Sequence, residues 1–416
     1  MNNKWIVVAL LCVANIIAYV DRTNLSVALA SKEFKDFFRL TDAQRGDLSS
    51  AFFWSYAFLQ IPIGALADRF GVKYPFAISF LIWSLVSAAT GWATNLWQLF
   101  AFRILLGIGE AIITPGSLRW IRLHIDEKQR GLAIGLFFAG AKLGPAIGAY
   151  SAAVLIGAYG WREMFIILGL GCLIWLGPWL FFAKDDDRQL ETAAQASFNA
   201  PGVSFAAVFK TPAIYGIIIG TFAYNYFNYF CLTWLPAYFV EQWHLSKQDM
   251  GLFTAFSFTG MAIVAILAGL AGDRLIARGW NPIKVRKGFT IAGLAVASTE
   301  VFGVMSGSRD IALTFAIISL TGLGLATANY WALTQSLMPG AAIGRIAGVQ
   351  NFASNLSGIV APIVTGRLIA LTGSYEAPMI AILFILMSGI AAYVFLVRPK
   401  YAPRASEFAP AGTSRS

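Results

Sequence analysis

Twelve apolar stretches, each long enough to cross a bilayer as a helix, divide this chain of 416 residues. A backbone surrounded by lipid must satisfy its own hydrogen bonds, so each stretch is expected to be helical. The chain is therefore predicted to be an all-α integral membrane protein with twelve transmembrane helices. By approximate bounds the stretches are 4–30, 45–67, 74–94, 96–120, 129–153, 161–183, 211–240, 249–271, 287–307, 311–337, 343–372 and 374–397.

The composition supports a membrane protein. Charged residues make up 12% of the chain, whereas a soluble protein carries about 25%. The first apolar stretch has no small-residue cleavage site and continues past Asp21 and Arg22, so it is interpreted as a retained span and not as a signal peptide. Cys12, Cys172 and Cys231 fall in apolar stretches, which implies no disulfide framework.

Lysine and arginine are unevenly distributed between the two sides of the predicted bundle. With the N-terminus placed inside, 20 of the 31 fall in inner segments, 8 fall in outer segments and three lie within spans. By the positive-inside rule the chain is predicted to be a multi-pass protein of the inner (plasma) membrane with both termini cytoplasmic. The net charge of +10 therefore belongs to short loops on one side, which argues against nucleic acid as a partner.

The two halves of the chain repeat each other. A Gly/Ala/Leu-rich segment ending in Asp-Arg occurs at 64–69 and again at 269–274, about half the chain apart. A glycine and a proline fourteen residues apart occur in the fifth and the eleventh stretch. The predicted organisation is an N-terminal six-helix bundle at 1–183, a cytoplasmic linker at 184–210, a C-terminal six-helix bundle at 211–400 and a disordered cytoplasmic tail at 401–416.

Three motifs resemble those of the major facilitator superfamily, whose fold is two such six-helix repeats. They are Gly-x-Leu-x-Asp-Arg-x-Gly-x-Lys at 64–73, the Arg…Gly-x-Gly-Glu pattern from Arg103 to Glu110, and the Gly/Pro-rich stretch at 140–148. Within the superfamily, the sequence at 19–26 is similar to the first span of the anion:cation symporter family. Bacterial hexuronate, galactonate and glucarate transporters belong to that family, as do vesicular glutamate transporters and sialin. The resemblance covers essentially the whole chain.

Arg22 and Arg103 are the candidate ligands for an anionic substrate. A carboxylate that enters a membrane cavity loses its water, and a guanidinium replaces that water with two parallel charge-assisted hydrogen bonds. Ionisable residues inside a span usually mark a transport pathway. The alternative is structural: each arginine is neutralised by its neighbour, Asp21 or Glu110, and only holds helices together. Arg103 and Glu110 share a helix face but lie roughly 10 Å apart, so each needs a partner elsewhere or faces a watery cavity.

Asp21 and Glu110 are the candidate proton-coupling residues. A low dielectric disfavours the ionised carboxylate and a nearby arginine favours it. A substrate that competes for the arginine would favour protonation, and this couples proton and anion. The family resemblance implies the same role for these two positions. The alternative is a permanent ion pair that latches helices together.

Further polar residues lie within the spans. Lys142, in the middle of the fifth span, is expected either to contact a second substrate group or to pair with Glu110. Amide and aromatic side chains suit a polyol substrate, although interhelical hydrogen bonds would use the same residue types. The candidate substrate-binding residues of this kind are Tyr56, Asn225, Asn228, Tyr330, Trp331, Asn351 and Asn355.

The repeated Asp-Arg pairs are assigned to gating. Asp68 with Arg69, and Asp273 with Arg274, lie at the predicted cytoplasmic membrane face and not in a cavity. They are expected to form charge latches between adjacent helices.

The predicted function is a secondary active transporter that imports a sugar-derived carboxylate (a hexuronate, aldonate or aldarate) by proton symport with alternating access. The alternative within transport is a carrier or exchanger of aromatic or dicarboxylic acids. A membrane enzyme is disfavoured because no catalytic, metal or nucleotide motif occurs, and a nutrient sensor because no long output domain occurs. The expected partners are the organic anion, protons and the lipid bilayer; no cofactor is expected, and a monomer is predicted.

Overall fold

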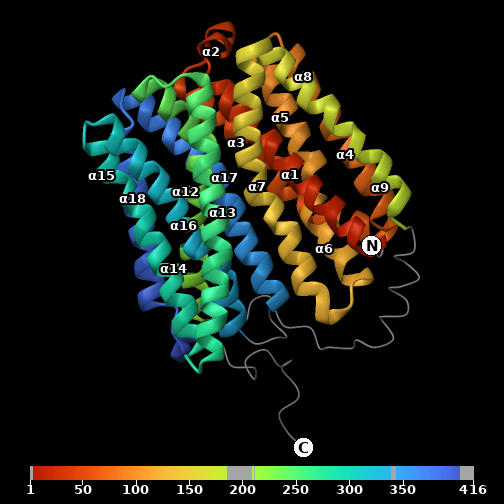
Figure 1. Cartoon of the computed structure of the whole chain (residues 1–416), viewed down its shortest axis with the longest axis vertical. Helices are drawn as coiled ribbons and strands as arrows, with labels where there is room; N and C mark the ends of the chain where they lie inside the picture. Colours follow the sequence, from red (N-terminus) through yellow and green to blue (C-terminus); the bar gives the residue numbers. More distant parts are fainter. Residues whose placement is uncertain (1–2, 185–208, 210, 339–342, 403–416) are drawn as a thin grey trace, which may run out of the picture. The chain divides into compact units, whose positions relative to one another are not determined.

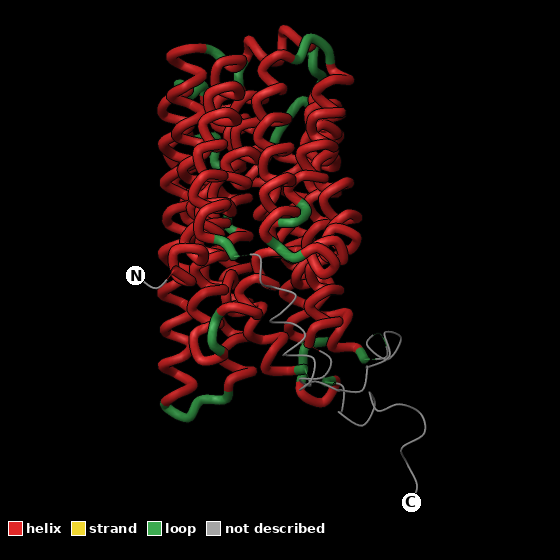
Figure 2. Tube along the Cα trace, turned by 90° about the vertical axis from the view of Figure 1, so that its right-hand side faces the viewer, coloured by secondary structure: helices red, strands yellow, loops and turns green. Residues whose placement is uncertain are grey.

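The computed structural model describes residues 3–184, 209, 211–338 and 343–402. Figure 2 shows this part of the chain as helices joined by short loops. The predicted linker at 184–210 lies outside the described residues except at Lys184 and Phe209, and the predicted tail lies outside them beyond Ala402.

The elements follow one another along the chain as Figure 1 labels them. In the first half they are α1 (Asn3–Ala30), α2 (Lys32–Phe38), α3 (Asp42–Phe70), α4 (Lys73–Ala89), η1 (Thr90–Trp92), α5 (Leu96–Glu110), α6 (Ile113–His124), α7 (Glu127–Tyr159), α8 (Trp161–Gly171), η2 (Cys172–Trp175) and α9 (Leu176–Phe182). In the second half they are α12 (Pro212–Trp243), α13 (Lys247–Ala277), α14 (Pro282–Ser298), α15 (Glu300–Met305), α16 (Arg309–Leu337), α17 (Ile343–Thr372), α18 (Glu376–Phe395) and η4 (Pro399–Tyr401).

Helices occupy all twelve predicted spans, and the predicted fold class is confirmed. Ten spans among the described residues are long and apolar enough to cross a membrane. The helices α3 and α12, of 29 and 32 residues, occupy the second and seventh predicted stretches. Turns break two stretches, the fourth after Glu110, between α5 and α6, and the ninth at Thr299, between α14 and α15. The sixth stretch passes through the 3-10 helix η2 between α8 and α9. Charged residues lie at both breaks.

The chain clusters into two compact units. Unit 1 comprises residues 1–198, 232–258 and 362–370, and unit 2 comprises residues 199–231, 259–361 and 371–416. Unit 1 therefore combines the first-half helices with short segments of α12, α13 and α17. The domain boundaries that we predict from the sequence stay a prediction.

Glycines bring the helices of unit 1 close together around α1. A Cβ on Gly140 of α7 would lie 2.5 Å from the carbonyl oxygen of Cys12, and one on Gly144 would lie 2.5 Å from the Cβ of Tyr19. A Cβ on Gly107 of α5 would lie 2.4 Å from the carbonyl oxygen of Phe52 in α3. Only glycine permits these approaches, because any side chain would have to occupy space already filled by backbone.

Candidate functional site

Arg22 of α1 forms an ion pair with Glu110, the last residue of α5, inside unit 1. The Arg22 Nη2 and Glu110 Oε2 atoms are 2.8 Å apart, and Arg22 Nε donates a second hydrogen bond of 2.9 Å to the same oxygen. The side chains are 5% and 0% exposed, so the pair is shielded from solvent. The structural alternative from the sequence paired Arg22 with Asp21; the structure instead pairs it with a carboxylate from another helix.

Three aromatic rings surround the Arg22 guanidinium. Its central carbon lies 4.5 Å from the ring centroid of Tyr19, 4.6 Å from that of Phe52 and 4.6 Å from that of Tyr56. Cation–π attraction and the flat ring faces hold the guanidinium plane in one orientation. The sequence analysis selected Tyr56 and missed Tyr19 and Phe52. The spacing of Tyr19 and Arg22, three residues apart on one helix face, was the available signal.

Asp21 lies beside Arg22 in the chain but has different partners. It is 1% exposed, and its Oδ1 accepts hydrogen bonds from Ser87 Oγ at 2.5 Å and from Asn24 Nδ2 at 3.3 Å. Arg103 Nη1 donates to the backbone carbonyl oxygen of Asp21 at 3.4 Å. Arg103 thus approaches α1 at Asp21, while Glu110, about two turns further along the same face of α5, approaches it at Arg22.

Several charged atoms of this cluster have no hydrogen-bond partner among the described residues. They are Asp21 Oδ2, Glu110 Oε1, and the Nε and Nη2 atoms of Arg103. Buried polar atoms in proteins are nearly always hydrogen-bonded. The cluster therefore has donor and acceptor capacity that the protein's own side chains do not use.

Lys142 lies on α7, two residues after Gly140, and is partly exposed. Its predicted contact with a substrate stays a prediction.

The polar residues selected in the second half lie in unit 2. The hydroxyl groups of Tyr224 and Thr327 are 2.7 Å apart, and the rings of Tyr224 and Tyr330 have centroids 4.6 Å apart. Two of the asparagines donate hydrogen bonds to backbone carbonyls of their own helices. Asn225 donates to the carbonyl of Thr221 at 2.9 Å, and Asn355 donates to that of Asn351 at 3.0 Å. Asn228 is buried, and Trp331 is half-buried. Their predicted role in binding substrate stays a prediction.

The predicted gating residues lie near the C-terminal ends of α3 and α13. The side chain of Asp68 lies outside the described ones, and Arg69 lies over the ring of Phe70 at 5.3 Å. In unit 2, Asp273 accepts a hydrogen bond from Arg286 of α14, and Arg274 is exposed.

Arg286 connects Asp273 to other helices of unit 2, and the sequence analysis missed it. Its Nη1 donates to Asn329 Oδ1 of α16 at 2.9 Å while its Nη2 donates to Asp273 of α13. The residue therefore links three helices of unit 2. The sequence carried no signal for it, because the pairing joins helices whose contact is not visible in the chain order.

Glu300 is a buried carboxyl that the sequence analysis also missed. It is 3% exposed, lies at the break between α14 and α15, and accepts a hydrogen bond of 2.5 Å from Ser319 Oγ. The rule applied to Glu110, that an ionisable residue inside a span is significant, would have selected it.

Comparisons with known proteins agree on one family. The family model described as Major Facilitator Superfamily matches residues 11–362. The chain is 30% identical over 401 residues to a probable L-galactonate transporter of Escherichia coli (strain K12), with 94% of this chain and 88% of that protein covered. It is 31% identical over 409 residues to a probable sulfoacetate transporter of Cupriavidus necator, with 95% and 94% covered. It is similar in fold to a solved bacterial homologue of the human lysosomal transporter Spinster, with a TM-score of 0.82 at 17% identity over 97% of this chain and 99% of that chain.

Proposed function

Because this chain belongs to the Major Facilitator Superfamily, we propose that it is a secondary active transporter that imports a sugar-derived organic anion with protons by alternating access. The observation that carries the proposal is the Arg22–Glu110 pair inside an aromatic cage. A relative of similar length is named a probable L-galactonate transporter, which supports a sugar acid as substrate.

The proposed chemistry is an exchange of carboxylates on Arg22. A substrate carboxylate takes the two hydrogen bonds that Glu110 now accepts, and Glu110 is left buried without its cation. A buried carboxylate without a cation is strongly disfavoured, so Glu110 takes up a proton. One anion and one proton then enter together, and the charge of the cluster is unchanged. When the site opens to the inside, the reverse exchange releases both.

The remaining cluster residues are given supporting roles. Asp21 is proposed as the second proton site, with Ser87 as its hydrogen-bond donor. Arg103 and Lys142 are proposed to contact the substrate's second polar end, and the amide and aromatic residues selected in the second half keep their proposed role in binding hydroxyl groups. Asp273 is proposed as a gating residue.

The competing substrate class is an aromatic or dicarboxylic acid. The aromatic rings around Arg22 and the second cation at Lys142 favour it. A thermal-shift screen of the purified protein against hexuronates, aldonates, aldarates and aromatic acids, followed by counterflow in proteoliposomes, separates the two classes. Stabilisation and counterflow by aromatic acids alone would overturn the sugar-acid proposal.

Both termini are proposed to be cytoplasmic. The excess of lysine and arginine in alternate loops supports this orientation. A reporter enzyme fused after Arg404, or inserted in the 184–208 linker, should be active as a cytoplasmic fusion. Periplasmic activity at either position contradicts the orientation.

Asp273→Asn is expected to slow transport by about fivefold at most without weakening substrate binding at equilibrium. The substitution removes the charge that holds Arg286, and hence the link between α13 and α14, but leaves the cage around Arg22 intact. Initial uptake rates and the binding constant from thermal shift measure the two quantities separately. Asp310→Asn, at an exposed aspartate at the start of α16, serves as the control and should change neither. Equal losses of binding and transport in Asp273→Asn would argue against gating.

A further inference from the structure

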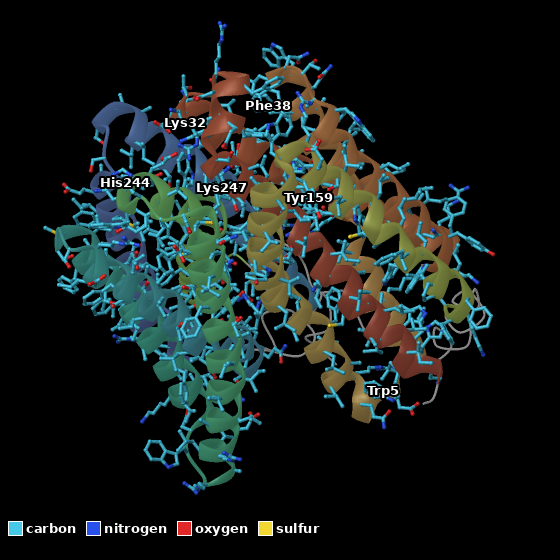
Figure 3. All side chains as sticks on the ribbon, turned by 45° about the horizontal axis from the view of Figure 1, so that its top comes forward. Trp5, Lys32, Phe38, Tyr159, His244 and Lys247 are labelled. Atoms are coloured by element: carbon cyan, nitrogen blue, oxygen red, sulfur yellow. The ribbon has the colours of Figure 1, made fainter. Side chains whose placement is uncertain are left out.

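Ion pairs accumulate at one end of unit 1, the end that carries α2. Figure 3 shows the labelled Lys32, Tyr159, His244 and Lys247 at this end, with Trp5 at the other. The pairs join residues of α2 and α3 to residues of α12, α13 and α17, which follow about 200 or more positions later in the chain. They are Lys35–Glu241, Arg45–Glu241, Lys247–Glu33 and Arg367–Asp47, and Arg45 is also paired with Asp42 within α3.

Glu241 of α12 is shared by two cations. Its carboxylate is bonded to Lys35 of α2, and its Oε1 lies 3.1 Å from Arg45 Nη1 of α3. The Arg45 side chain is only 3% exposed, and its guanidinium carbon lies 4.7 Å from the ring centroid of Trp234, also in α12. Arg45 is therefore packed against α12 by both charge and aromatic contact.

A surface hollow of about 600 Å³ lies over this pair. Its lining residues are Lys35, Asp36, Arg39, Leu40, Asp42, Arg45 and Glu241. Solvent therefore reaches one side of the Glu241 carboxylate, which is 23% exposed, while its Arg45 partner is buried. The Arg45–Glu241 pair is stable while α3 and α12 are in contact, and water can hydrate both charges as soon as these helices separate.

The backbones at this end approach as closely as glycine allows. A Cβ on Gly366 of α17 would lie 2.4 Å from the carbonyl oxygen of Asp42, and one on Gly46 of α3 would lie 2.4 Å from that of Pro362. A Cβ on Gly251 of α13 would lie 2.5 Å from the Cβ of Ala153 in α7. The sequence thus permits tight contact on two sides of the ion pairs.

We propose that Glu241 is the latch of an outer gate: its carboxylate, held between Lys35 and Arg45, keeps the α2 end of the transporter closed, and its release opens that end to an incoming anion. The inference rests on the proposed alternating-access function, because only such a cycle requires the outer end to open and close. The distribution of lysine and arginine predicts that the α2 end lies outside. Glu241 is a positioning residue that does not touch the substrate in the Arg22 cage.

The rim pair Lys247–Glu33 is not the latch. The Glu33 side chain is 64% exposed, and such surface pairs contribute little to stability. Hydrogen bonds from Ser31 and from Lys247 lower the pKa of Glu33 to about 2, so the pair stays ionised at every physiological pH. Glu33 therefore provides a matched control at the same end of the protein.

The test compares the open and closed populations without any ligand. Spin labels are attached at Lys32→Cys in α2 and Gln248→Cys in α13, both exposed, after replacement of Cys12, Cys172 and Cys231 by alanine. Pulsed EPR then gives the distance distribution. Glu241→Gln is expected to raise the open-to-closed ratio about tenfold, which is about 1.4 kcal/mol, and Glu33→Gln is expected to change it by less than about twofold. Glu241→Asp, which keeps the charge on a shorter side chain, should lie between the parent and Glu241→Gln.

A second variant opens the gate without altering charge. Gly366→Ala places a methyl group against the carbonyl oxygen of Asp42 and is expected to shift the distances in the same direction as Glu241→Gln. If Glu241→Gln leaves the distribution of the parent unchanged, or shifts it no more than Glu33→Gln does, the latch is overturned. Because no substrate is present, this result is independent of the substrate screen. If no sugar acid binds but Glu241→Gln shifts the distances, only the sugar-acid proposal is rejected. If a sugar acid binds but Glu241→Gln shifts nothing, only the latch is rejected.

Discussion

Replacing Arg22 by alanine is expected to abolish uptake while the protein still inserts into the membrane. The variant removes the two hydrogen bonds that a substrate carboxylate would take over from Glu110. A hydrogen bond to a charged group is worth about 1.5–3 kcal/mol, so the loss of two corresponds to a decrease of about 100-fold or more in substrate affinity. Uptake of labelled substrate in cells, normalised to the amount of protein in the membrane, measures the effect.

Arg22→Lys separates the geometry of the guanidinium from its charge. Lysine keeps the positive charge beside Glu110 but cannot form two parallel bonds or stack flat among Tyr19, Phe52 and Tyr56. We therefore expect poor rescue. Arg309→Ala, at an exposed arginine at the start of α16, is the control and should retain uptake. Near-normal uptake by Arg22→Lys would remove the argument for bidentate recognition.

The sequence predicted the helices well because lipid imposes a strong and local rule. Each apolar stretch must satisfy its backbone within itself, so length and composition are enough to locate it. The break after Glu110 was not predicted, because the stretch from Leu96 to Trp120 stays apolar through it. Motif resemblance predicted the family, and the family match over residues 11–362 confirms it.

The sequence predicted which charges lie in the membrane but not which of them meet. The pairing of Arg22 with Glu110 and the approach of Arg103 to Asp21 depend on how α5 packs against α1 and α3. Gly107 sets the approach of α5 to α3 and Gly144 that of α7 to α1, and their effect appears only in three dimensions. The same limit explains why Glu241 and Arg286 were not among the predicted site residues.

The two proposed gates are built in the same way. At the α2 end Glu241 bridges Lys35 and Arg45, and in unit 2 Arg286 bridges Asp273 and Asn329. In each case one charged side chain holds residues of two other helices. A single side chain with two partners makes opening cooperative, because its release frees both contacts at once. This is why we expect Asp273→Asn and Glu241→Gln to alter rates and populations more than binding.

Glu110→Gln is expected to stop accumulation driven by a proton gradient while leaving exchange of internal for external substrate. The amide imitates the protonated acid permanently, so Arg22 is free to bind the substrate but no proton is gained or lost in the cycle. Exchange does not require the empty carrier to return, and counterflow should therefore remain within about tenfold of the parent. Gradient-driven uptake and counterflow, measured side by side in proteoliposomes, give the two quantities.

The competing explanation is that Glu110 only neutralises Arg22. Glu110→Gln would then leave a buried cation without its carboxylate, a change that costs about 3–5 kcal/mol, and the protein should lose thermal stability together with both transport modes. Asp21→Asn provides the comparison, because Asp21 accepts its hydrogen bonds from Ser87 and Asn24 and not from Arg22. If two sites share the proton, Asp21→Asn should also lose gradient-driven uptake, and the two carboxyl groups will titrate as a pair. A folded Glu110→Gln protein that still accumulates substrate fully would eliminate Glu110 as the proton carrier and leave that role to Asp21.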